Sequence, residues 1–584
     1  MSDLVVGIDI GTTNCKAVVL SVEENRVVAT ASLAYSLSED REPDGAGEIA
    51  IAPIWQAVVG LFAKMRGNAH VSWPDIRAIG LSGAMHSLIA MPVVQSGELR
   101  SDSETHTGGG DGQHRIALRA TTWQSLDAVV KVRQLRNQLG EARVRELYAR
   151  TGCPLQWVYH PARLAALSDR EPKVFQEASR FASIKEWITW KLTGRWVIDF
   201  GLASTTGLLD IHQLRWDAEA LSIAGVEAEY LSQLVEPDAE VGTLLPDVAK
   251  LLGFQQSVCV VAGGSDGALA NLGVLGDWRA RDITTSTSKN APATTCVRAG
   301  VVMTVGTSGA VRVAANSPVT DVKLGHERTW CYYLADDMYV AGGAINNGGI
   351  ALAWMLERLR ENGCADESEI GYEDAAELID NVPIGADGLR VYPYLTGERS
   401  PHWRSDWREV VLGQTESHCA GHLIRATMES VVFAMKENLE AVAGLGPMLL
   451  DGCEDVANKK KCDADQVNEA TFTIQLTGGI TKLPSWCQML CDAIGCAVVA
   501  SDRVDASVVG AAMLARRRCV IKSQGCDSEE LFRYEVPRCL ESEDDRDTTS
   551  QSGQIIYQPE AARVSTYRLV YMDWVAKRLL AYSK

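Results

Sequence analysis

Apolar and polar residues alternate in short blocks over the first hundred residues of the chain. Residues 4–10, 17–22, 27–31 and 76–82 are apolar runs bounded by polar or glycine-containing turns, a pattern typical of β-strands. Between the third and fourth runs, residues 53–65 carry apolar side chains at helical spacing. Three strands, a helix and a further strand predict a ribonuclease-H-like α/β unit.

The same pattern starts again about 300 residues later. Residues 301–305 and 311–314 are strand-like and flank a glycine-containing turn. We expect a helix over about 346–360, a long helix that Ser417 caps and that runs to about 443, and a strand at 473–476. A strand, a Gly-Thr turn and a second strand in both places indicate an internal duplication.

With 584 residues the chain is longer than one hydrophobic core usually organises. We therefore expect an N-terminal domain over 1–276 and a C-terminal domain over 277–584, with a cleft between them. Residues 125–245 are expected to be mostly helical. Polar stretches at about 99–117, 280–298, 447–468 and 520–560 lack the residues that build a core, which predicts surface loops there.

The charge balance and cysteine usage limit the partners and the compartment. Lys and Arg number 56 and Asp and Glu 75, a net charge of −19, so we expect no nucleic-acid partner. No run of about 18 apolar residues predicts a membrane span, and a strand so near the start leaves no room for a signal peptide. The 15 cysteines include no C-x-x-C pair, which favours a reducing, cytoplasmic location. A peroxisome-like organelle is the alternative only if the native chain extends to Ser-Lys-Leu.

The first turn carries groups that suit a phosphate and a metal ion. Asp9 ends a strand, where a carboxylate can hold Mg²⁺ through water. Glycine, hydroxyl and amide groups follow, and phosphates need such donors. The residues concerned are Thr12, Thr13, Asn14 and Lys16. The plainer interpretation is a β-hairpin with a polar turn.

The second turn repeats this chemistry from the other half of the chain. Gly306 and Thr307 follow the strand at 301–305, and two opposed glycine-hydroxyl turns can clamp a nucleotide's phosphates from both sides. Glycines at Gly478 and Gly479 also follow a strand, where an adenine ring can lie against backbone. An ordinary strand-to-helix turn explains these last two glycines equally well.

Two further segments carry candidate catalytic and substrate-binding residues. Ser265 and Asp266 follow a predicted buried strand at 258–262, where a carboxylate can accept a hydroxyl proton during phosphoryl transfer. A helix cap is the alternative for Asp266. Met85 and His86 lie between two apolar runs, and the histidine is either a ligand of a polyol or a structural residue.

These elements together resemble the FGGY family of carbohydrate kinases, whose fold is that of actin, hexokinase and the Hsp70 ATPase. The resemblance covers about 1–275 and 299–515. Segments such as SGAMHSLIAM at 82–91, GGAINNGG at 342–349 and YPYLTGERSP at 392–401 are most similar to gluconate kinases. It implies ATP, Mg²⁺ and a sugar-acid substrate, and the phosphorylation of D-gluconate to 6-phosphogluconate. Xylulokinase or another polyol or ketose kinase is the alternative, and a non-catalytic actin- or Hsp70-like nucleotide switch is a more distant one.

The resemblance also implies roles for residues. Asp266 is the expected catalytic base and Asp9 the expected metal-side carboxylate. Thr12, Thr13, Asn14, Lys16, Gly306, Thr307, Gly348, Gly349, Gly478 and Gly479 are expected along the nucleotide. Met85, His86, Trp123 and Ser265 are expected at the sugar acid, near 155–161. We expect a monomer or a homodimer.

One departure concerns the substrate side. Related kinases usually have Trp-x-Asp-x-Arg after the Met-His strand, whereas Trp123 here is followed by Gln-Ser-Leu-Asp. The usual arginine is thus displaced or lost, and Arg115 or Arg119 is a possible replacement. A buried carboxylate needs a cation or several donors, and one of Arg163 and Lys185 is the expected source of that charge. His418 and His422 share a helix face, but further zinc ligands are not evident.

Overall fold

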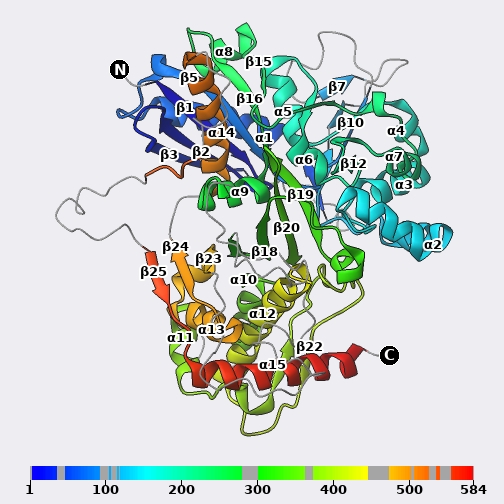
Figure 1. Cartoon of the computed structure of the whole chain (residues 1–584), viewed down its shortest axis with the longest axis vertical. Coiled ribbons are helices and arrows are strands. Elements are labelled where there is room, and N and C mark those ends of the chain that lie inside the picture. Colours follow the sequence, from blue (N-terminus) through cyan, green and yellow to red (C-terminus); the bar gives the residue numbers. More distant parts are fainter. Residues whose placement is uncertain are drawn as a thin grey trace, which may run out of the picture.

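The computed structural model describes residues 3–35, 47–92, 104–106, 115–117, 119–278, 300–361, 372–444, 473–501, 506–524, 534–538 and 554–582. Two large β-sheets, each with helices packed against it, form the two halves of the molecule (Figure 1). The predicted two-part α/β architecture is therefore confirmed.

The first sheet is built from the N-terminal half of the chain. Its order is β15-β16-β5-β1-β2-β3. β1 pairs antiparallel with β2 and parallel with β5, and β5 pairs parallel with β16. The bounds are β1 (Leu4–Ile10), β2 (Asn14–Ser21), β3 (Arg26–Ala34), β5 (Ile76–Gly83), β15 (Glu240–Thr243) and β16 (Cys259–Ser265). All the strands expected in this half are present.

The second sheet repeats this topology. Its order is β19-β20-β18-β17-β23-β24-β25. β17 pairs antiparallel with β18 and parallel with β23, which pairs parallel with β24. The bounds are β17 (Val301–Val305), β18 (Gly309–Ala315), β19 (Trp330–Ala335), β20 (Met338–Ile345), β23 (Ile474–Thr477), β24 (Val498–Ser501) and β25 (Gln554–Tyr557). β1, β2, β5 and β16 thus correspond to β17, β18, β23 and β24, as an internal duplication requires.

One helix from late in the chain packs on the first sheet. α14 (Ala506–Gln524) lies against β1, β5 and α9 (Asp266–Leu275), and Figure 1 shows it in orange beside the blue strands. The contact is backbone to backbone at glycines, because a Cβ on Gly7 would lie 2.2 Å from Val508 O and one on Gly80 2.1 Å from Ala511 O. Any side chain at either glycine would push the helix away from the sheet.

The remaining helices cover the outer faces of the sheets and build a helical region beside the first. Their bounds are α1 (Ala52–Arg66), α2 (Val129–Thr151), α3 (His160–Arg170), α4 (Pro172–Glu177), α5 (Ile184–Thr193), α6 (Phe200–Ser204), α7 (Ala218–Ala224), α8 (Pro246–Leu252), α10 (Gly349–Glu361), α11 (Tyr372–Asp380), α12 (Ala420–Val442), α13 (Pro484–Ile494) and α15 (Ala561–Tyr582).

Short strand pairs complete the described part. They are β4 (Glu48–Ala50) with β9 (Arg119–Thr121), β6 (Ile89–Pro92) with β10 (Ala178–Ala182), β7 (Glu104–His106) with β8 (Arg115–Ala117), β11 (Val197–Asp199) with β14 (Gln233–Val235), β12 (Leu209–Asp210) with β13 (Arg215–Trp216), and β21 (Arg390–Tyr392) with β22 (Val410–Leu412).

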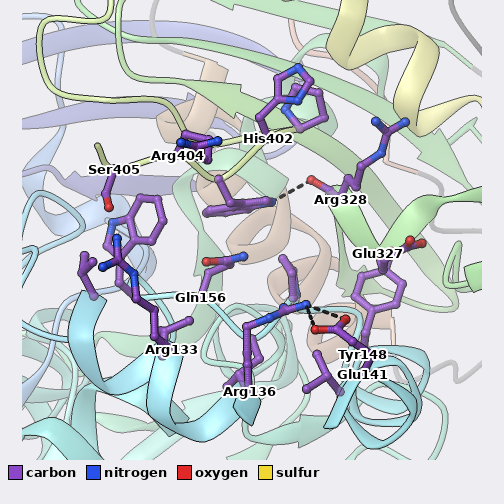
Figure 2. Close-up of a pocket in the computed structure, with 18 of the residues that line it drawn as sticks. Arg133, Arg136, Glu141, Tyr148, Gln156, Glu327, Arg328, His402, Arg404 and Ser405 are labelled. Carbon is purple, nitrogen blue, oxygen red and sulfur yellow. Dashed lines mark hydrogen bonds and ion pairs between the residues drawn. The ribbon is translucent and has the colours of Figure 1, made fainter. Parts of the chain in front are cut away.

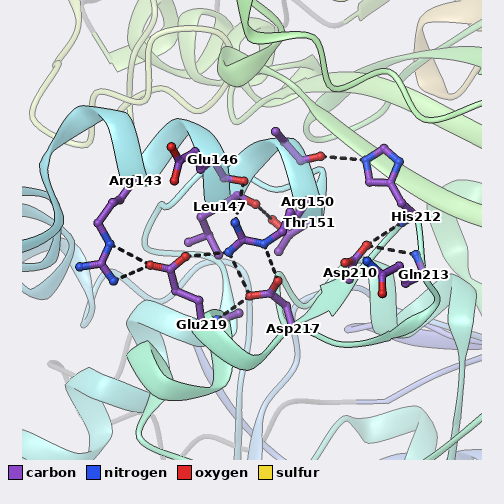
Figure 3. Close-up of polar contacts among 12 residues, drawn as sticks. Arg143, Glu146, Leu147, Arg150, Thr151, Asp210, His212, Gln213, Asp217 and Glu219 are labelled. Atoms are coloured by element: carbon purple, nitrogen blue, oxygen red, sulfur yellow. Dashed lines mark hydrogen bonds and ion pairs between the residues drawn. The ribbon is translucent and has the colours of Figure 1, made fainter.

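An ion-pair network joins two helices of the helical region (Figure 3). Arg150 of α2 contacts Asp217 and Glu219 at 2.7 Å each, and Arg143 contacts Glu219 at 2.5 Å. Asp217 also accepts the Ala220 amide at 2.8 Å and so caps α7. Because several charges share partners, the network stabilises the α2–α7 contact more than an isolated surface pair would.

Several sequence predictions are wrong in detail. The long helix has Cys419 rather than Ser417 at its N-cap. The stretch at 520–560 is not loop throughout, because α14 continues to Gln524 and β25 pairs with β24 at the edge of the sheet. The stretches at 280–298 and 447–468 lie outside the described residues, as does most of 99–117. Within the described chain, no helix is both long and apolar enough to cross a membrane.

Candidate active site

Two carboxylates meet at one edge of the first sheet. β1 and β16 both lie beside β5 and run parallel to it, so their carboxyl ends reach the same edge. Asp9 stands one residue before the end of β1, and its Oδ1 accepts a hydrogen bond from Ser82 Oγ of β5. Asp266 follows β16 directly and is the first residue of α9.

The geometry of Asp266 differs from that of a helix cap. Ser265 occupies the N-cap position, and Asp266 Oδ1 accepts the amide of the next residue, Gly267, at 2.7 Å. A capping carboxylate would instead accept an amide two or three residues on. The capping alternative is thus not what the structure contains, and the carboxylate remains at the sheet edge.

The surroundings of Asp266 bring the pKa of its carboxyl close to neutral pH. Burial and, to a smaller extent, the negative charge of Asp9 raise the pKa of the carboxyl to about 7, although Arg312 and the amides of Gly267 and Met85 oppose the rise. A group with such a pKa can both accept and release a proton near pH 7. Perturbed carboxyls of this kind concentrate at functional sites.

A cavity of about 270 Å³ separates these carboxylates from the second sheet. Asp9, Asp266 and Gly267 line one wall, and Thr304, Arg312, Thr477 and Gly478 line the other. The Thr304 and Thr477 hydroxyls lie 3.0 Å apart, and Arg312 Nη1 donates to Thr304 at 3.1 Å. Two carboxylates facing one space repel each other, and a hard divalent cation such as Mg²⁺ fits between such oxygen ligands.

Glycine-containing backbone forms a compact cradle next to this cavity. Gly348 N donates to Thr307 O at 3.1 Å, and Gly349 N donates to Gly306 O at 2.6 Å. A Cβ on Gly348 would lie 2.6 Å from the Ser308 carbonyl carbon. Gly349 begins α10, so the cradle sits at a helix N-terminus, where backbone amides and the helix dipole favour phosphate.

The glycines after β23 join the same region. Gly478 has φ +94°, which strains any other residue, and a Cβ there would lie 2.5 Å from Val305 O. Gly479 begins the short 3₁₀ helix at Gly479–Lys482. The structure therefore brings together the turns after β17 and β23, as expected of neighbouring parallel strands.

The first-half turn lies beside Asp9. Gly11 N donates to Asn14 O at 3.1 Å, which closes the turn that contains Thr12 and Thr13. Lys16 stands directly opposite Asp9 in the β1–β2 ladder. None of Thr12, Thr13, Asn14 and Lys16 lines the 270 Å³ cavity itself.

The sugar-side candidates form a second group, next to α9. A Cβ on Gly267 would lie 2.9 Å from Met85 Cε, so Met85 contacts the start of the helix. His86 is buried, has φ +62°, and packs edge-on against Tyr159 at 5.2 Å. Burial holds the His86 pKa well below its usual value, with nearby arginines adding to the effect, so the ring is neutral at pH 7. Its Nδ1 has no partner among the described residues and is free to bind a hydroxyl.

The two cations expected to hold a carboxylate are engaged elsewhere. Lys185 forms an ion pair with Asp199, and both side chains are buried. Arg163 donates to the His86 carbonyl and to Thr121 Oγ1, which fixes the strained backbone of His86. Lys185 and Arg163 thus have structural partners beside the sugar-side residues.

The charged residues on either side of Trp123 are also engaged in structural contacts. Asp127 pairs with Arg170 at 2.5 Å, and Arg119 pairs with Glu48 at 3.2 Å. The guanidinium of Arg399 lies over the ring of Trp123, with its central carbon 4.7 Å from the ring centroid. Sequence reasoning did not name Arg399 or Arg312 as site residues, although Arg399 lies in the YPYLTGERSP segment and Arg312 is a charged residue within an apolar, strand-like run.

A larger cavity, about 610 Å³, lies away from the carboxylates, between α2 and residues 401–406 (Figure 2). Its lining is rich in charged side chains that pair with one another, such as Arg136 with Glu141 and Arg404 with Asp406. Trp403 also lines this cavity, and its ring centroid lies 6.2 Å from that of Tyr159. Tyr159 in turn contacts His86, so this cavity adjoins the sugar side from outside.

Two histidine clusters in the second half do not form evident metal sites. His422 Nε2 lies 3.1 Å from Asp387 and its Nδ1 lies 3.2 Å from Cys419 Sγ, but these residues and His418 do not form a group of three ligand atoms within reach of one ion in the described chain. Glu398, His402 and Glu437 lie close enough to share an ion. The Arg578 guanidinium, however, contacts both oxygens of Glu437 at 2.6 Å and already supplies a positive charge there.

Comparison with known proteins identifies the family. The N-terminal domain of the FGGY family of carbohydrate kinases matches residues 4–96 and 109–273, and its C-terminal domain matches residues 301–519. The chain belongs to the FGGY family of carbohydrate kinases. Membership makes it a sugar kinase, as the sequence motifs implied.

Relatives within the FGGY family include gluconate and xylulose kinases. The gluconokinases of Bacillus licheniformis and Bacillus subtilis are 31% and 32% identical to this chain over 524 and 519 residues, covering 88% of it and 87% of each relative. The xylulose kinase of Bacillus subtilis is 25% identical over 518 residues. The crystal structure of gluconate kinase from Lactobacillus acidophilus has a TM-score of 0.73 at 23% identity, covering 100% of this chain and 99% of its own.

Proposed function

We propose that this kinase transfers the γ-phosphoryl group of ATP to the primary hydroxyl of D-gluconate, giving 6-phosphogluconate. The observation that carries the reaction type is the pair Asp9 and Asp266 facing hydroxyl and amide donors across one cavity, with the pKa of Asp266 raised to about 7. The identity of 31–32% to gluconokinases, against 25% to a xylulose kinase, supports the acid as substrate.

Each wall of the cavity has its own part in this proposal. Asp266 accepts the proton of the attacking hydroxyl, and Asp9, oriented by Ser82, holds Mg²⁺. Gly306, Thr307, Gly348 and Gly349 surround the phosphates, with Thr12, Thr13, Asn14 and Lys16 on the opposite side. Gly478 and Gly479 border the base. Bound ATP·Mg²⁺ supplies the phosphoryl group and neutralises the charge that develops on it.

The sugar acid then lies on the α9 side of the cavity. Met85, His86 and Ser265 contact its hydroxyls, with Trp123 behind. We also propose that the domains divide near 276/277, with α14 crossing back onto the first sheet, and that closure of the two halves excludes water.

A substrate screen tests the proposal. ADP release is measured with gluconate, xylulose, ribulose, glycerol and erythritol, with the Asp266→Asn variant as the blank for each. Gluconate should give the highest kcat/KM. A clear preference for xylulose would replace gluconate with the rival substrate, and strong ATP hydrolysis that no sugar stimulates would favour a nucleotide switch.

A further inference from the structure

A buried cation without a counter-ion lies on the sugar side of the site. Arg399 belongs to the loop between β21 and β22, in the second half of the chain, and its guanidinium covers the ring of Trp123 from the first half. No carboxylate pairs with it in the described part of the chain, and its Nε is buried with no hydrogen-bond partner. Burial lowers the Arg399 pKa to about 10, so the group remains charged at pH 7.

The neighbours of Arg399 are the sugar-side residues. The positive charge of Arg399 acts to lower the pKa values of His86, Tyr159 and Tyr332. The hydroxyls of Tyr159 and Tyr332 lie 3.0 Å apart and share one hydrogen bond. Arg312 is also close enough to lower the Arg399 pKa, and Arg312 in turn faces Asp266. Arg312 therefore lies between the candidate base Asp266 and Arg399, and Arg399 lies next to the aromatic residues Tyr159 and Tyr332.

The loop that carries Arg399 is fixed on both sides. Glu398 N donates to Arg404 O at 2.9 Å, and Ser400 N donates to Ala344 O at 3.1 Å. Asn347 Nδ2 donates to Gly397 O at 3.1 Å. Stacking on Trp123 restrains the guanidinium itself. A side chain held in this way loses little conformational entropy when it binds a ligand.

A planar guanidinium presents two parallel N–H donors that match a carboxylate. We propose that Arg399 is the residue that binds the substrate carboxylate, with the hydroxyl at the opposite end of the chain directed toward Asp266. This inference rests on the proposed function, because it needs an acid as substrate. It replaces Arg163 and Lys185, whose donors are used by His86, Thr121 and Asp199.

The test compares gluconate with gluconamide, which has the same shape but no charge. For the wild-type enzyme, KM should be about 10- to 100-fold lower for gluconate than for gluconamide, the range for a charged hydrogen-bonded contact. Arg399→Gln should bring the two KM values within about threefold of each other, mainly by raising that of gluconate. Arg399→Lys should give an intermediate preference and serves as the second variant if the glutamine protein does not fold.

Arg404→Gln is the matched control. Arg404 lies five residues away and pairs with Asp406 at 2.7 Å, so its loss should leave the preference for gluconate unchanged. If Arg399→Gln and Arg399→Lys keep the wild-type preference, or raise KM equally for gluconate and gluconamide, Arg399 is not the carboxylate partner although gluconate remains the substrate. If the wild-type enzyme does not phosphorylate gluconate, the proposed function fails first and this inference fails with it.

Discussion

The two halves of the chain place different chemistry at the same point of one scaffold. In the first sheet, Asp9 of β1 stands opposite Ser82 of β5 and accepts its hydroxyl hydrogen bond. In the second sheet, Thr304 of β17 stands opposite Thr477 of β23, and their hydroxyls lie 3.0 Å apart. Both pairs occupy corresponding positions in corresponding strands, and Asp9, Thr304 and Thr477 line the same cavity.

The difference is one of charge. The first half places the carboxylate Asp9 near the end of β1 and Asp266 directly after β16, whereas the position in β17 that corresponds to Asp9 is Thr304, and β18 adds the cation Arg312. Phosphates are repelled by bare carboxylates and attracted by hydroxyls, amides and arginine. In the proposed function, the duplicated fold supplies two similar walls, and these few differences would direct the metal and proton to one wall and the phosphates to the other.

The largest effect is expected from removing the base. Asp266→Asn should lower kcat by roughly 10²- to 10⁴-fold, the range for general base catalysis, and change ATP affinity by less than about threefold. Steady-state kinetics and calorimetric ATP titration measure the two quantities. Ser501→Ala, at the end of β24 on the same cavity, is the control and should keep most of the activity. A variant at Asp266 that retained more than a tenth of wild-type kcat would rule out its role as base.

The second expected effect concerns the metal side. Asp9→Asn should raise the Mg²⁺ concentration needed for half-maximal rate by at least about tenfold, because one carboxylate ligand is lost. Ser82→Ala removes only the hydrogen bond that orients Asp9 and should give a smaller rise in the same titration. Equal Mg²⁺ dependence in wild type and Asp9→Asn would place the metal elsewhere.

Local sequence predicted the parts of this comparison that depend on neighbouring residues. Strand periodicity located β1, β5, β17 and β23, and the glycines at their ends marked the turns. Asp266 was also singled out as a candidate base, with a helix cap as the alternative, and the structure places it directly after β16 as the first residue of α9. These features follow from rules of spacing over a few residues.

The parts that were not predicted depend on contacts between distant segments. Arg312 lies inside β18, where its strand pattern gives no sign that it faces Asp266. Lys185 was expected to hold the substrate, but the fold brings Asp199 from 14 residues away to pair with it. Arg399 meets Trp123 only because the two halves of the chain pack together. Spacing along the chain carries no information on such pairs.

A third prediction concerns the pH dependence of kcat/KM, which reports how the charges around Asp266 set its pKa. The base must be unprotonated, so kcat/KM should rise with pH and level off above the Asp266 pKa of about 7. Arg312 lowers that pKa, and Arg312→Gln should therefore move the rise to higher pH. The Arg404→Gln protein should keep the wild-type profile. A shift to lower pH in Arg312→Gln would contradict the assigned electrostatics.

The smallest effect is expected from the hydroxyl pair of the second sheet. Thr304→Val keeps the shape of the side chain but removes the oxygen that contacts Thr477 and accepts from Arg312 at 3.1 Å. No unit charge is lost; the bond with Thr477 is neutral and contributes about 1 kcal/mol, and the one from the charged Arg312 contributes about 1.5 kcal/mol, so KM for ATP should rise by roughly tenfold while the pH profile changes little. Thr304→Ser restores the hydroxyl and should restore KM. The corresponding change on the other wall, Asp9→Asn, also preserves shape, yet it removes a charge and should cost far more. If Thr304→Val proved as damaging as Asp9→Asn, the two walls would not differ in the way that their charges imply.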